Sequence, residues 1–282
     1  MENANIRELL KSAGFRFNKA LGQNFIFDGN LLDAVAADSG VGREDTVIEV
    51  GTGAGTLTAR LAARAGKVIS FEVDRSLQSV LSLSLKGCDN VEVVFRDVLK
   101  MPDGEIEKLT GGAPFRVAAN LPYYITTPLV MRFIESSLPV TSLTVMVQKE
   151  VADRMTAQPD SPDYAALTLA VAIFGRAYVT RPVGRQMFYP APNVDSAVVR
   201  IDAEPDKLSG ENILLLKKVV RAAFAMRRKT LVNNLQSAFA LSKQDAQSVV
   251  ESAGFSPLVR GETLSLDDFA ALSRALEKRI YG

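Results

Sequence analysis

The chain alternates short runs of apolar residues with stretches whose apolar positions recur every three or four residues. Runs rich in β-branched residues, such as 46–50 and 67–72, are typical of strands. The segments 57–65 and 77–85, which follow these runs, have the spacing of helices. This alternation is typical of βαβ units, so we expect an α/β fold with a mostly parallel sheet covered by helices on both faces.

The same pattern predicts the rest of the sheet and two flanking helices. Further strands are predicted over 91–95, 115–119, 143–148, 177–181 and 197–201. The segment 143–148 is almost wholly apolar, which favours a central strand buried on both faces. Helices are predicted over 30–37, after the capping residue Asp28, and over 127–135, where Pro128 lies in the first turn.

The character of the sequence changes after Ile201. The segment 202–206 is polar and contains a proline, and the periodicity beyond it is helical over 211–224, 227–240, 243–253 and 266–278. We therefore expect two domains, an α/β domain over residues 1–203 and a small all-helical domain over residues 204–282. From Lys207 to the end there are 12 Lys+Arg against 7 Asp+Glu in a chain of net charge +1, so the helical domain is the basic part.

Composition excludes several kinds of chemistry. The chain has no histidine, which excludes a Ser-His-Asp triad, an imidazole base and most zinc catalysis. Cys88 is the single cysteine, so an internal disulfide and a cysteine-rich metal site are excluded, and we expect no metal. No run of about 18 apolar residues occurs and the N-terminus is a poor secretory signal, so we expect a cytoplasmic protein without a membrane partner. The low net charge confines any nucleic-acid surface to a local patch.

A glycine-rich turn follows the first strand of the predicted sheet. Gly51, Gly53 and Gly55 lie between the strand and the helix that follows it. Glycines let the backbone turn tightly and approach a ligand at the carboxyl end of a parallel strand. A dinucleotide fingerprint would need glycine at the sixth position of the motif, where Thr56 stands. The spacing therefore favours a nucleoside cofactor without a pyrophosphate.

Acidic residues end the next two predicted strands. Glu72 ends the second strand, where a carboxylate can accept hydrogen bonds from both hydroxyls of a ribose. The same geometry serves NAD, so Glu72 indicates a nucleoside without identifying it. Asp97 ends the third strand, where an acid is placed to accept from an adenine amino group. Either residue read alone is also compatible with a solvated acid at a strand end.

The tetrapeptide Asn120-Leu121-Pro122-Tyr123 follows the fourth predicted strand. The lone pair of an adenine N6 is delocalised into the ring, so methylation requires this nitrogen to be drawn toward tetrahedral geometry. The Asn120 side-chain oxygen and the Leu121 carbonyl can accept from its two N–H bonds, and Tyr123 offers a ring for stacking. Pro122 fixes the turn and brings no competing N–H. The tetrapeptide predicts a catalytic loop for an amino nitrogen on a flat ring, without specifying RNA.

Four segments in order along nearly the whole chain resemble one known family, the rRNA adenine N6-dimethyltransferases. They are 19–25 (KALGQNF), the tetrapeptide 120–123, 188–197 (FYPAPNVDSA) and 224–231 (FAMRRKTL). The resemblance implies a Rossmann-like class I methyltransferase sheet, S-adenosyl-L-methionine as cofactor, and dimethylation of N6 of two adjacent adenosines. It further implies that the substrate is small-subunit (16S) rRNA within an assembling 30S subunit. The chain departs from the usual motifs at Ile26, Thr52 and Tyr124, where leucine, proline and asparagine are frequent.

The resemblance also assigns residues to roles. The cofactor-binding set that it implies comprises Asn24, Ile26, Gly51, Gly53, Glu72, Asp97 and Asn120. It implies that Phe188 faces Tyr123 across the flipped adenine, and the alternative is a core aromatic beside a proline turn. Candidate phosphate contacts in the helical domain are Arg221, Arg227, Arg228 and Lys229, and the alternative for this basic run is a solvated helix face.

The sequence leaves three other functions open. The first is a related antibiotic-resistance activity that modifies large-subunit rRNA. The second is a non-catalytic ribosome-assembly or RNA-binding factor, against which the intact Glu72, Asp97 and Asn120 argue. The third is an NAD-dependent oxidoreductase, which the glycine spacing disfavours. The oligomeric state does not follow from the sequence.

Overall fold

The computed structural model describes residues 3–15, 17–18 and 22–281, so residues 19–21 of the first family motif lie outside the described residues. The chain forms two compact units. One comprises Met1–Ala152 and Ala177–Ala203, and the other comprises Asp153–Arg176 and Glu204–Gly282. The expected boundary after residue 203 coincides with a change of unit, whereas residues 153–176, which we expected in the first domain, belong to the second unit.

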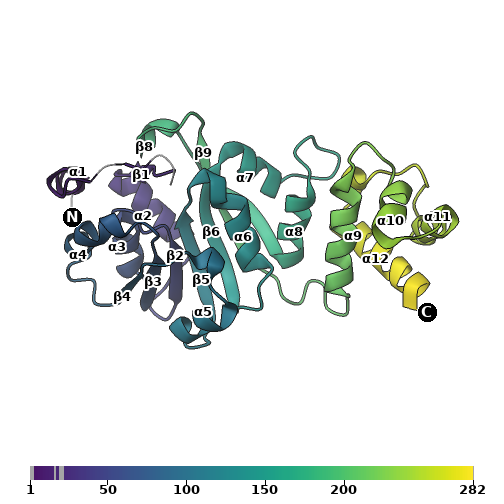
Figure 1. Ribbon diagram of the computed structural model, residues 1–282, viewed down its shortest axis with the longest axis horizontal. Coiled ribbons are helices and arrows are strands. Elements are labelled where there is room, and N and C mark those ends of the chain that lie inside the picture. The colour runs from purple at the N-terminus through teal and green to yellow at the C-terminus, as the bar shows by residue number, and fades with distance from the viewer. Residues whose placement is uncertain (1–2, 16, 19–21, 282) are drawn as a thin grey trace. The chain divides into compact units, whose positions relative to one another are not determined.

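The first unit is built on a seven-stranded sheet with the strand order β4-β3-β2-β5-β6-β9-β7 (Figure 1). Its strands are β2 (Thr46–Val50), β3 (Lys67–Phe71), β4 (Val91–Val94), β5 (Phe115–Asn120), β6 (Val140–Gln148), β7 (Gly175–Val183) and β9 (Ser196–Ala203). The strands from β4 to β6 pair in parallel, and β9 runs antiparallel to β6. The α/β class and the mostly parallel sheet predicted from the hydrophobic pattern are confirmed.

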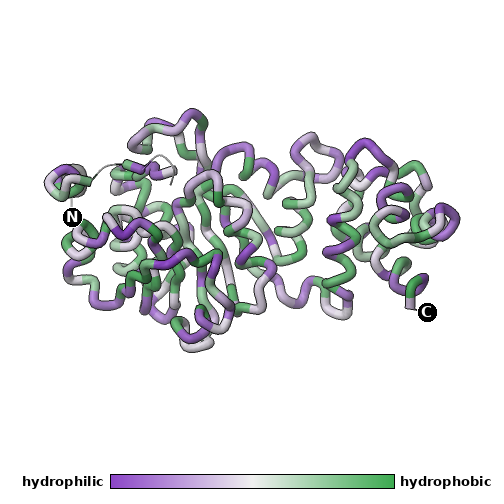
Figure 2. The backbone as a smooth tube through the Cα atoms, viewed as in Figure 1, coloured by the Kyte–Doolittle hydropathy of each residue, from purple (hydrophilic) through white to green (hydrophobic). Residues whose placement is uncertain are grey.

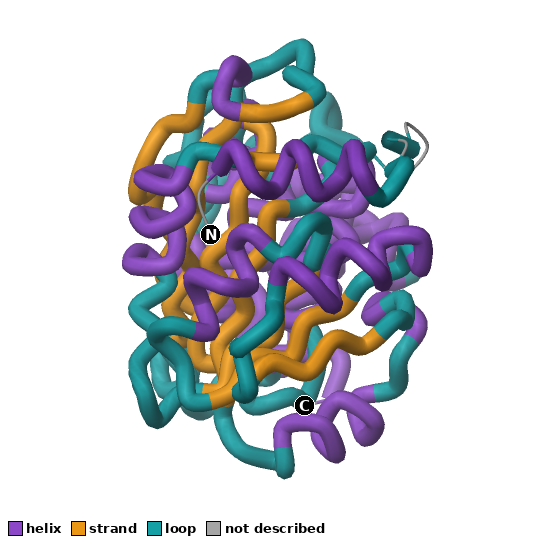
Figure 3. The backbone as a smooth tube through the Cα atoms, turned by 90° about the vertical axis from the view of Figure 1, so that its left-hand side faces the viewer, coloured by secondary structure: helices purple, strands orange, loops and turns teal. Residues whose placement is uncertain are grey.

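Helices cover both faces of this sheet. They are α2 (Gly29–Asp38), α3 (Thr56–Ala62), α4 (Gln78–Ser84), α5 (Asp103–Thr110) and α6 (Thr126–Ile134). Ala118 of β5 packs in one apolar core with α2 and α3, whereas Phe115 of the same strand contacts Phe133 of α6, with ring centroids 6.3 Å apart. Because residues three apart on a strand point to opposite faces, α6 covers the face opposite to α2 and α3. Figure 2 shows the hydrophobic runs of the central strands, and Figure 3 shows helices in front of the strands.

An N-terminal segment lies across the carboxyl end of the sheet. It contains α1 (Asn3–Ser12) and β1 (Phe25–Ile26), and β1 pairs antiparallel with β8 (Phe188–Tyr189). The register joins Ile26 to Phe188, two residues 162 positions apart. Aromatic rings of this segment contact one another, with Phe17 and Phe25 centroids 5.4 Å apart. This packing brings the two distant family motifs to the same place.

The second unit is helical. It contains α8 (Ala166–Phe174), α9 (Ile213–Ala225), α10 (Leu231–Phe239), α11 (Lys243–Ser252) and α12 (Leu266–Tyr281), and α7 (Lys149–Met155) spans the boundary between the units. Its core includes Leu216, Leu235 and Phe269, all fully buried. The predicted helix 227–240 begins later than expected, at Leu231, because residues 226–229 form a turn. Within the described part of the chain, no helix is both long and apolar enough to cross a membrane.

Candidate functional site

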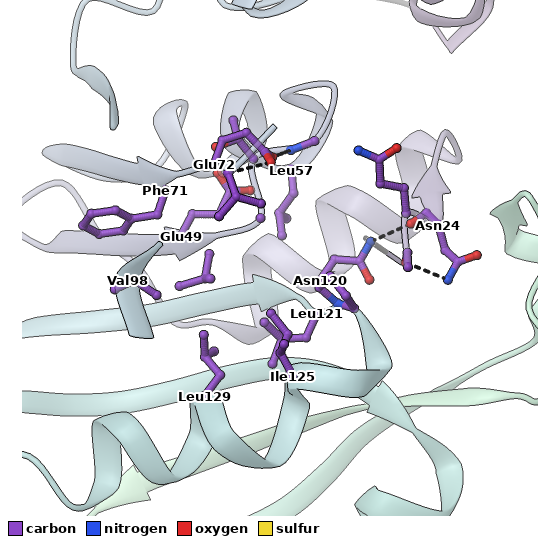
Figure 4. A pocket seen from close by; sticks show the side chains of 18 of the residues that line it. Asn24, Glu49, Leu57, Phe71, Glu72, Val98, Asn120, Leu121, Ile125 and Leu129 are labelled. Carbon is purple, nitrogen blue, oxygen red and sulfur yellow. Dashed lines mark hydrogen bonds between the residues drawn. The ribbon is translucent and has the colours of Figure 1, made fainter. Parts of the chain in front are cut away.

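A cavity of about 500 Å³ lies at the carboxyl ends of the parallel strands of the first unit (Figure 4). All of the residues assigned to the cofactor and to the catalytic loop line it: Asn24, Ile26, Gly51, Gly53, Glu72, Asp97, Asn120, Leu121, Pro122, Tyr123 and Phe188. This is the edge at which open α/β sheets bind their ligands. The structure therefore brings together residues that are up to 164 positions apart in the sequence.

The glycine turn lines the cavity with Gly51 and Gly53. Gly51 and Gly53 have φ angles of 82° and 55°, a region that disfavours side chains. A β-carbon on Gly53 would lie 2.8 Å from the Phe25 ring, so a larger residue there would displace this aromatic contact. The turn needs glycine both for its backbone conformation and for close packing under the N-terminal segment.

Glu72 connects the glycine turn to the end of β3. One carboxylate oxygen accepts from the Gly53 N–H at 2.8 Å, and the other accepts from the N–H groups of Val73 and Asp74, each at 2.8 Å. Burial raises the pKa of Glu72, while these three donors act in the opposite direction by favouring the ionised form. The oxygen that accepts a single N–H retains capacity for a ligand hydroxyl. Glu72 thus braces the glycine turn, and its role as a ribose acceptor stays a prediction.

Asp97 lies after β4 and lines the same cavity as Glu72. Its carboxylate accepts from the Leu99 N–H at 3.1 Å and lies 3.4 Å from the Lys100 ammonium. These contacts begin a short 3₁₀ turn over Val98–Lys100 and fix the direction of the acid. The side chain keeps 34% of its surface exposed, so an oxygen remains accessible to a polar group in the cavity.

Asn120 is held in one orientation by the N-terminal segment. Its side-chain NH₂ donates to the backbone carbonyl of Asn24 at 3.2 Å, and Figure 4 shows the amide turned toward that residue. The Asn24 side chain in turn donates to the Gly22 carbonyl at 3.2 Å. Because the nitrogen is engaged with Asn24, the oxygen of the Asn120 amide is the group available as an acceptor. This is the polarity that recognition of an amino group requires.

Two further residues of the tetrapeptide, Leu121 and Tyr123, make hydrogen bonds to neighbouring strands. The Leu121 N–H donates to the Met146 carbonyl at 3.4 Å, and Leu121 is buried. The Tyr123 hydroxyl and the Ser196 hydroxyl lie 2.7 Å apart, and burial raises the pKa of Tyr123. Tyr123 therefore remains a neutral ring anchored at its hydroxyl end. A ring fixed in this way suits stacking better than proton transfer.

Phe188 lies on β8, where it pairs with Ile26 of β1, and it lines the cavity. It is only 4% exposed and packs in the same core cluster as Ile26 and Leu57. Phe188 is therefore both a core aromatic and part of the cavity wall. Its place opposite Tyr123 across a base stays a prediction.

Glu49 was not singled out from the sequence, although it lines the cavity. It is 1% exposed, and one of its oxygens accepts from the Thr58 and Ser70 hydroxyls, each at 2.6 Å. The Ser70 hydroxyl also lies 2.7 Å from that of Thr52. Burial raises the pKa of Glu49 to about 8. An acid that follows Val47 and Ile48 in the strand 46–50 was the signal that could have identified this residue.

We expect Glu49→Gln to change how stability depends on pH. Because the folded pKa of about 8 lies above the usual glutamate value of 4.5, the stabilisation from protonated Glu49 is complete below about pH 4.5 and is lost as pH rises toward 8. Between pH 5.5 and 7.5 the free energy of unfolding of the wild type should fall by about 2 kcal/mol relative to that of Glu49→Gln. Denaturant unfolding of both proteins at the two pH values measures this difference. A difference that does not change with pH would mean that Glu49 is already ionised at pH 5.5.

The candidate RNA contacts lie in the second unit. Arg228 and Lys229 are exposed in the turn between α9 and α10, and Arg221 is exposed on α9. The Arg227 guanidinium donates to the Tyr164 carbonyl at 3.2 Å, so this residue also stabilises its own unit. The predicted roles of all four in RNA binding stay predictions.

The sheet and cavity together define a class of protein. The strand order, the nucleoside-type glycine turn, two acids at strand ends and an amide-bearing loop over one cavity are those of a class I S-adenosyl-L-methionine-dependent methyltransferase. Residues 14–276 match the model of the family described as ribosomal RNA adenine dimethylase, and the chain belongs to this family. It is therefore an rRNA adenine N6,N6-dimethyltransferase whose cofactor is S-adenosyl-L-methionine.

Individual relatives extend over nearly the whole chain. The chain is 42% identical to ribosomal RNA small subunit methyltransferase A of Clostridioides difficile (strain 630), with 97% of this chain and 96% of that protein covered. It is also 42% identical to the protein of the same name from Bacillus pumilus (strain SAFR-032), with 98% and 96% covered. A crystal structure of a dimethyladenosine transferase from Plasmodium falciparum is similar, with a TM-score of 0.75, 26% identity and 89% and 97% of the two chains covered. The expected class I sheet is confirmed.

Proposed function

We propose that the chain transfers methyl groups to N6 of two adjacent adenosines in small-subunit (16S) rRNA, within an assembling 30S subunit in the cytoplasm. The identity of 42% to two small-subunit methyltransferases over 97% and 98% of the chain supports this substrate. We assign Asn24, Ile26, Gly51, Gly53, Glu72 and Asp97 to the cofactor and Asn120, Leu121, Pro122, Tyr123 and Phe188 to the target base, with Asn120 adjoining both.

The observation that carries this proposal is the orientation of the Asn120 amide. Its nitrogen is engaged by the Asn24 carbonyl, which leaves its oxygen as an acceptor in the cavity. An acceptor selects a base that presents an amino group, as adenine does. Asn24, which we assign to the cofactor, therefore also fixes the orientation of the amide that we assign to the base.

The cavity residues perform three tasks in the proposed reaction. The cofactor supplies an electrophilic methyl group when bound. Asn120 and the Leu121 carbonyl accept from the N6 hydrogens and increase the availability of its lone pair, while Tyr123 and Phe188 hold the ring. The proton that N6 loses as the N–C bond forms leaves to water, because the chain contains no histidine to serve as a base. Positioning and hydrogen bonding thus account for the catalysis.

The direct test is methyl transfer to ribosomal subunits that lack the modification. We expect tritiated methyl groups from S-adenosyl-L-methionine to be incorporated into undermethylated small subunits, and mass spectrometry to place two methyl groups on N6 of each of two adjacent adenosines. Large subunits serve as the control acceptor of methyl groups. Transfer to large subunits alone would contradict the proposed substrate. Binding to small subunits without transfer would instead indicate an assembly factor.

The basic turn of the second unit gives a further prediction. Arg228→Ala combined with Lys229→Ala should weaken subunit binding and reduce the slope of log affinity against log salt by about one to two units, since each phosphate contact contributes close to one. Binding measured over a salt series tests this. Lys243→Ala, an exposed lysine on α11, is the control, with the slope expected to change less. Equal slopes for the wild type and the double variant would exclude phosphate contacts by this turn.

A further inference from the structure

Tyr124 stands at the cavity beside the catalytic loop, at a position to which the reaction proposed above gives no role. It lines the cavity and is 59% exposed, which makes it one of the most exposed aromatic side chains described. Its neighbour Tyr123 is anchored at its hydroxyl, 2.7 Å from the Ser196 hydroxyl. The two consecutive tyrosines therefore differ in environment, one fixed at the cavity wall and the other presented to solvent.

The Tyr124 ring is supported on one side by the N-terminal segment. A β-carbon on Gly22 would lie 3.3 Å from Cδ1 and 3.4 Å from Cε1 of this ring, and 3.3 Å from the Pro122 β-carbon. Gly22 has a φ of 59° and no side chain, so the backbone lies close to the ring. The backbone at Gly22 thus lies close to one side of the ring, while much of the residue's surface faces solvent. Such an arrangement suits a flat partner better than a folding role, because so little of the ring is buried.

We propose that Tyr124 is a stacking site for the base next to the target adenosine, an inference that rests on the proposed function. A target base that enters the cavity leaves its own stack and exposes a face of its neighbour. A second ring one residue along the chain from Tyr123 gives that neighbour a replacement surface. Aromatic stacking tolerates any base, so the site accepts whichever of two adjacent adenosines remains outside the cavity.

This stacking site predicts a particular pattern among substitutions. Tyr124→Phe keeps the ring, Tyr124→Leu keeps apolar bulk over Gly22 without a π-face, and Tyr124→Ala removes both. We expect the KM for undermethylated small subunits to be unchanged in Tyr124→Phe and to rise roughly tenfold in the Leu and Ala variants, the scale of one lost base–aromatic contact. S-adenosyl-L-methionine affinity should stay within about twofold of wild type in all three.

The experiment measures KM and kcat for subunits by tritium incorporation and cofactor affinity by calorimetry. Tyr281→Ala is the control, because Tyr281 is 76% exposed in the other unit. A wild-type KM in Tyr124→Leu, or a cofactor affinity that weakens as the KM rises, would overturn the inference in favour of simple packing. An unchanged KM in Tyr124→Ala would overturn it while leaving the proposed function intact. Failure of the unaltered protein to methylate subunits would instead overturn the proposed function, and the inference with it.

Discussion

Asn120→Ala is expected to lower kcat for methyl transfer to undermethylated small subunits by about a hundred- to a thousandfold, the usual cost of removing one preorganised hydrogen-bonding group. The alanine removes the acceptor of an N6 hydrogen and also the NH₂ group that donates to the Asn24 carbonyl at 3.2 Å. The loss should be much larger in kcat than in cofactor affinity, because Glu72 and the glycine turn are untouched. Single-turnover transfer with saturating cofactor measures it directly.

Two matched variants separate chemistry from folding. Asn120→Asp keeps an acceptor but cannot donate to Asn24, so its kcat should lie between those of the wild type and Asn120→Ala. Asn90→Ala removes another partly buried amide, which donates to the Ala62 and Ala65 carbonyls outside the cavity. It should lower thermal stability with little effect on kcat. Near-normal transfer by Asn120→Ala would exclude the proposed role of the amide.

Much of the sheet could be predicted because its strands are apolar and short. The strand 46–50 was predicted with the bounds that the structure has, and the predicted ends of 67–72 and 91–95 differ from the observed ends by one residue each. Side chains that follow parallel strands meet at one edge, so sequence position alone was enough to group Glu72, Asp97 and Asn120. The structure brings all three to one cavity, and their roles in binding and catalysis stay predictions.

Several of the elements that were missed lack a clear periodic pattern. α8 has the sequence ALTLAVAIF, which is apolar on nearly every side, so no helical stripe distinguishes it from a strand. α5 contains Gly104, which weakens the helical pattern. The pairing of β1 with β8 depends on residues more than 160 positions apart, and strands of two residues carry no periodicity at all.

The contacts of single polar groups were also beyond prediction from the sequence. The basic run Arg227-Arg228-Lys229 looks uniform in the sequence, yet the Arg227 guanidinium contacts the Tyr164 carbonyl, 63 positions away. Glu49 belongs to the same motif as Gly51, but its burial and its bonds to Thr58 and Ser70 depend on how β2, β3 and α3 pack. Tertiary packing therefore decides which of several like residues serve the site and which stabilise the fold.

Glu72→Gln is expected to weaken S-adenosyl-L-methionine binding by about a hundredfold or more. The carboxylate accepts three backbone N–H groups at 2.8 Å, from Gly53, Val73 and Asp74. A glutamine has one acceptor oxygen, and its NH₂ group would face at least one of these donors, so the glycine turn loses its brace and the ribose loses a charged acceptor. Hydrogen bonds to a charged group contribute about 1.5–3 kcal/mol each, and the loss of the two that the carboxylate would accept from the ribose hydroxyls accounts for this decrease in affinity.

Isothermal titration with the cofactor and thermal unfolding without it distinguish the two functions of Glu72. Glu92→Gln is the matched control, because Glu92 lies on the adjacent strand and forms an exposed pair with Lys67 at 3.5 Å, and we expect its cofactor affinity within about twofold of wild type. If Glu72→Gln binds the cofactor as tightly as Glu92→Gln does, the carboxylate is not a ribose acceptor. If it also unfolds at the same temperature, the three backbone bonds do not brace the turn, because the loss of that brace should lower the melting temperature of the ligand-free protein.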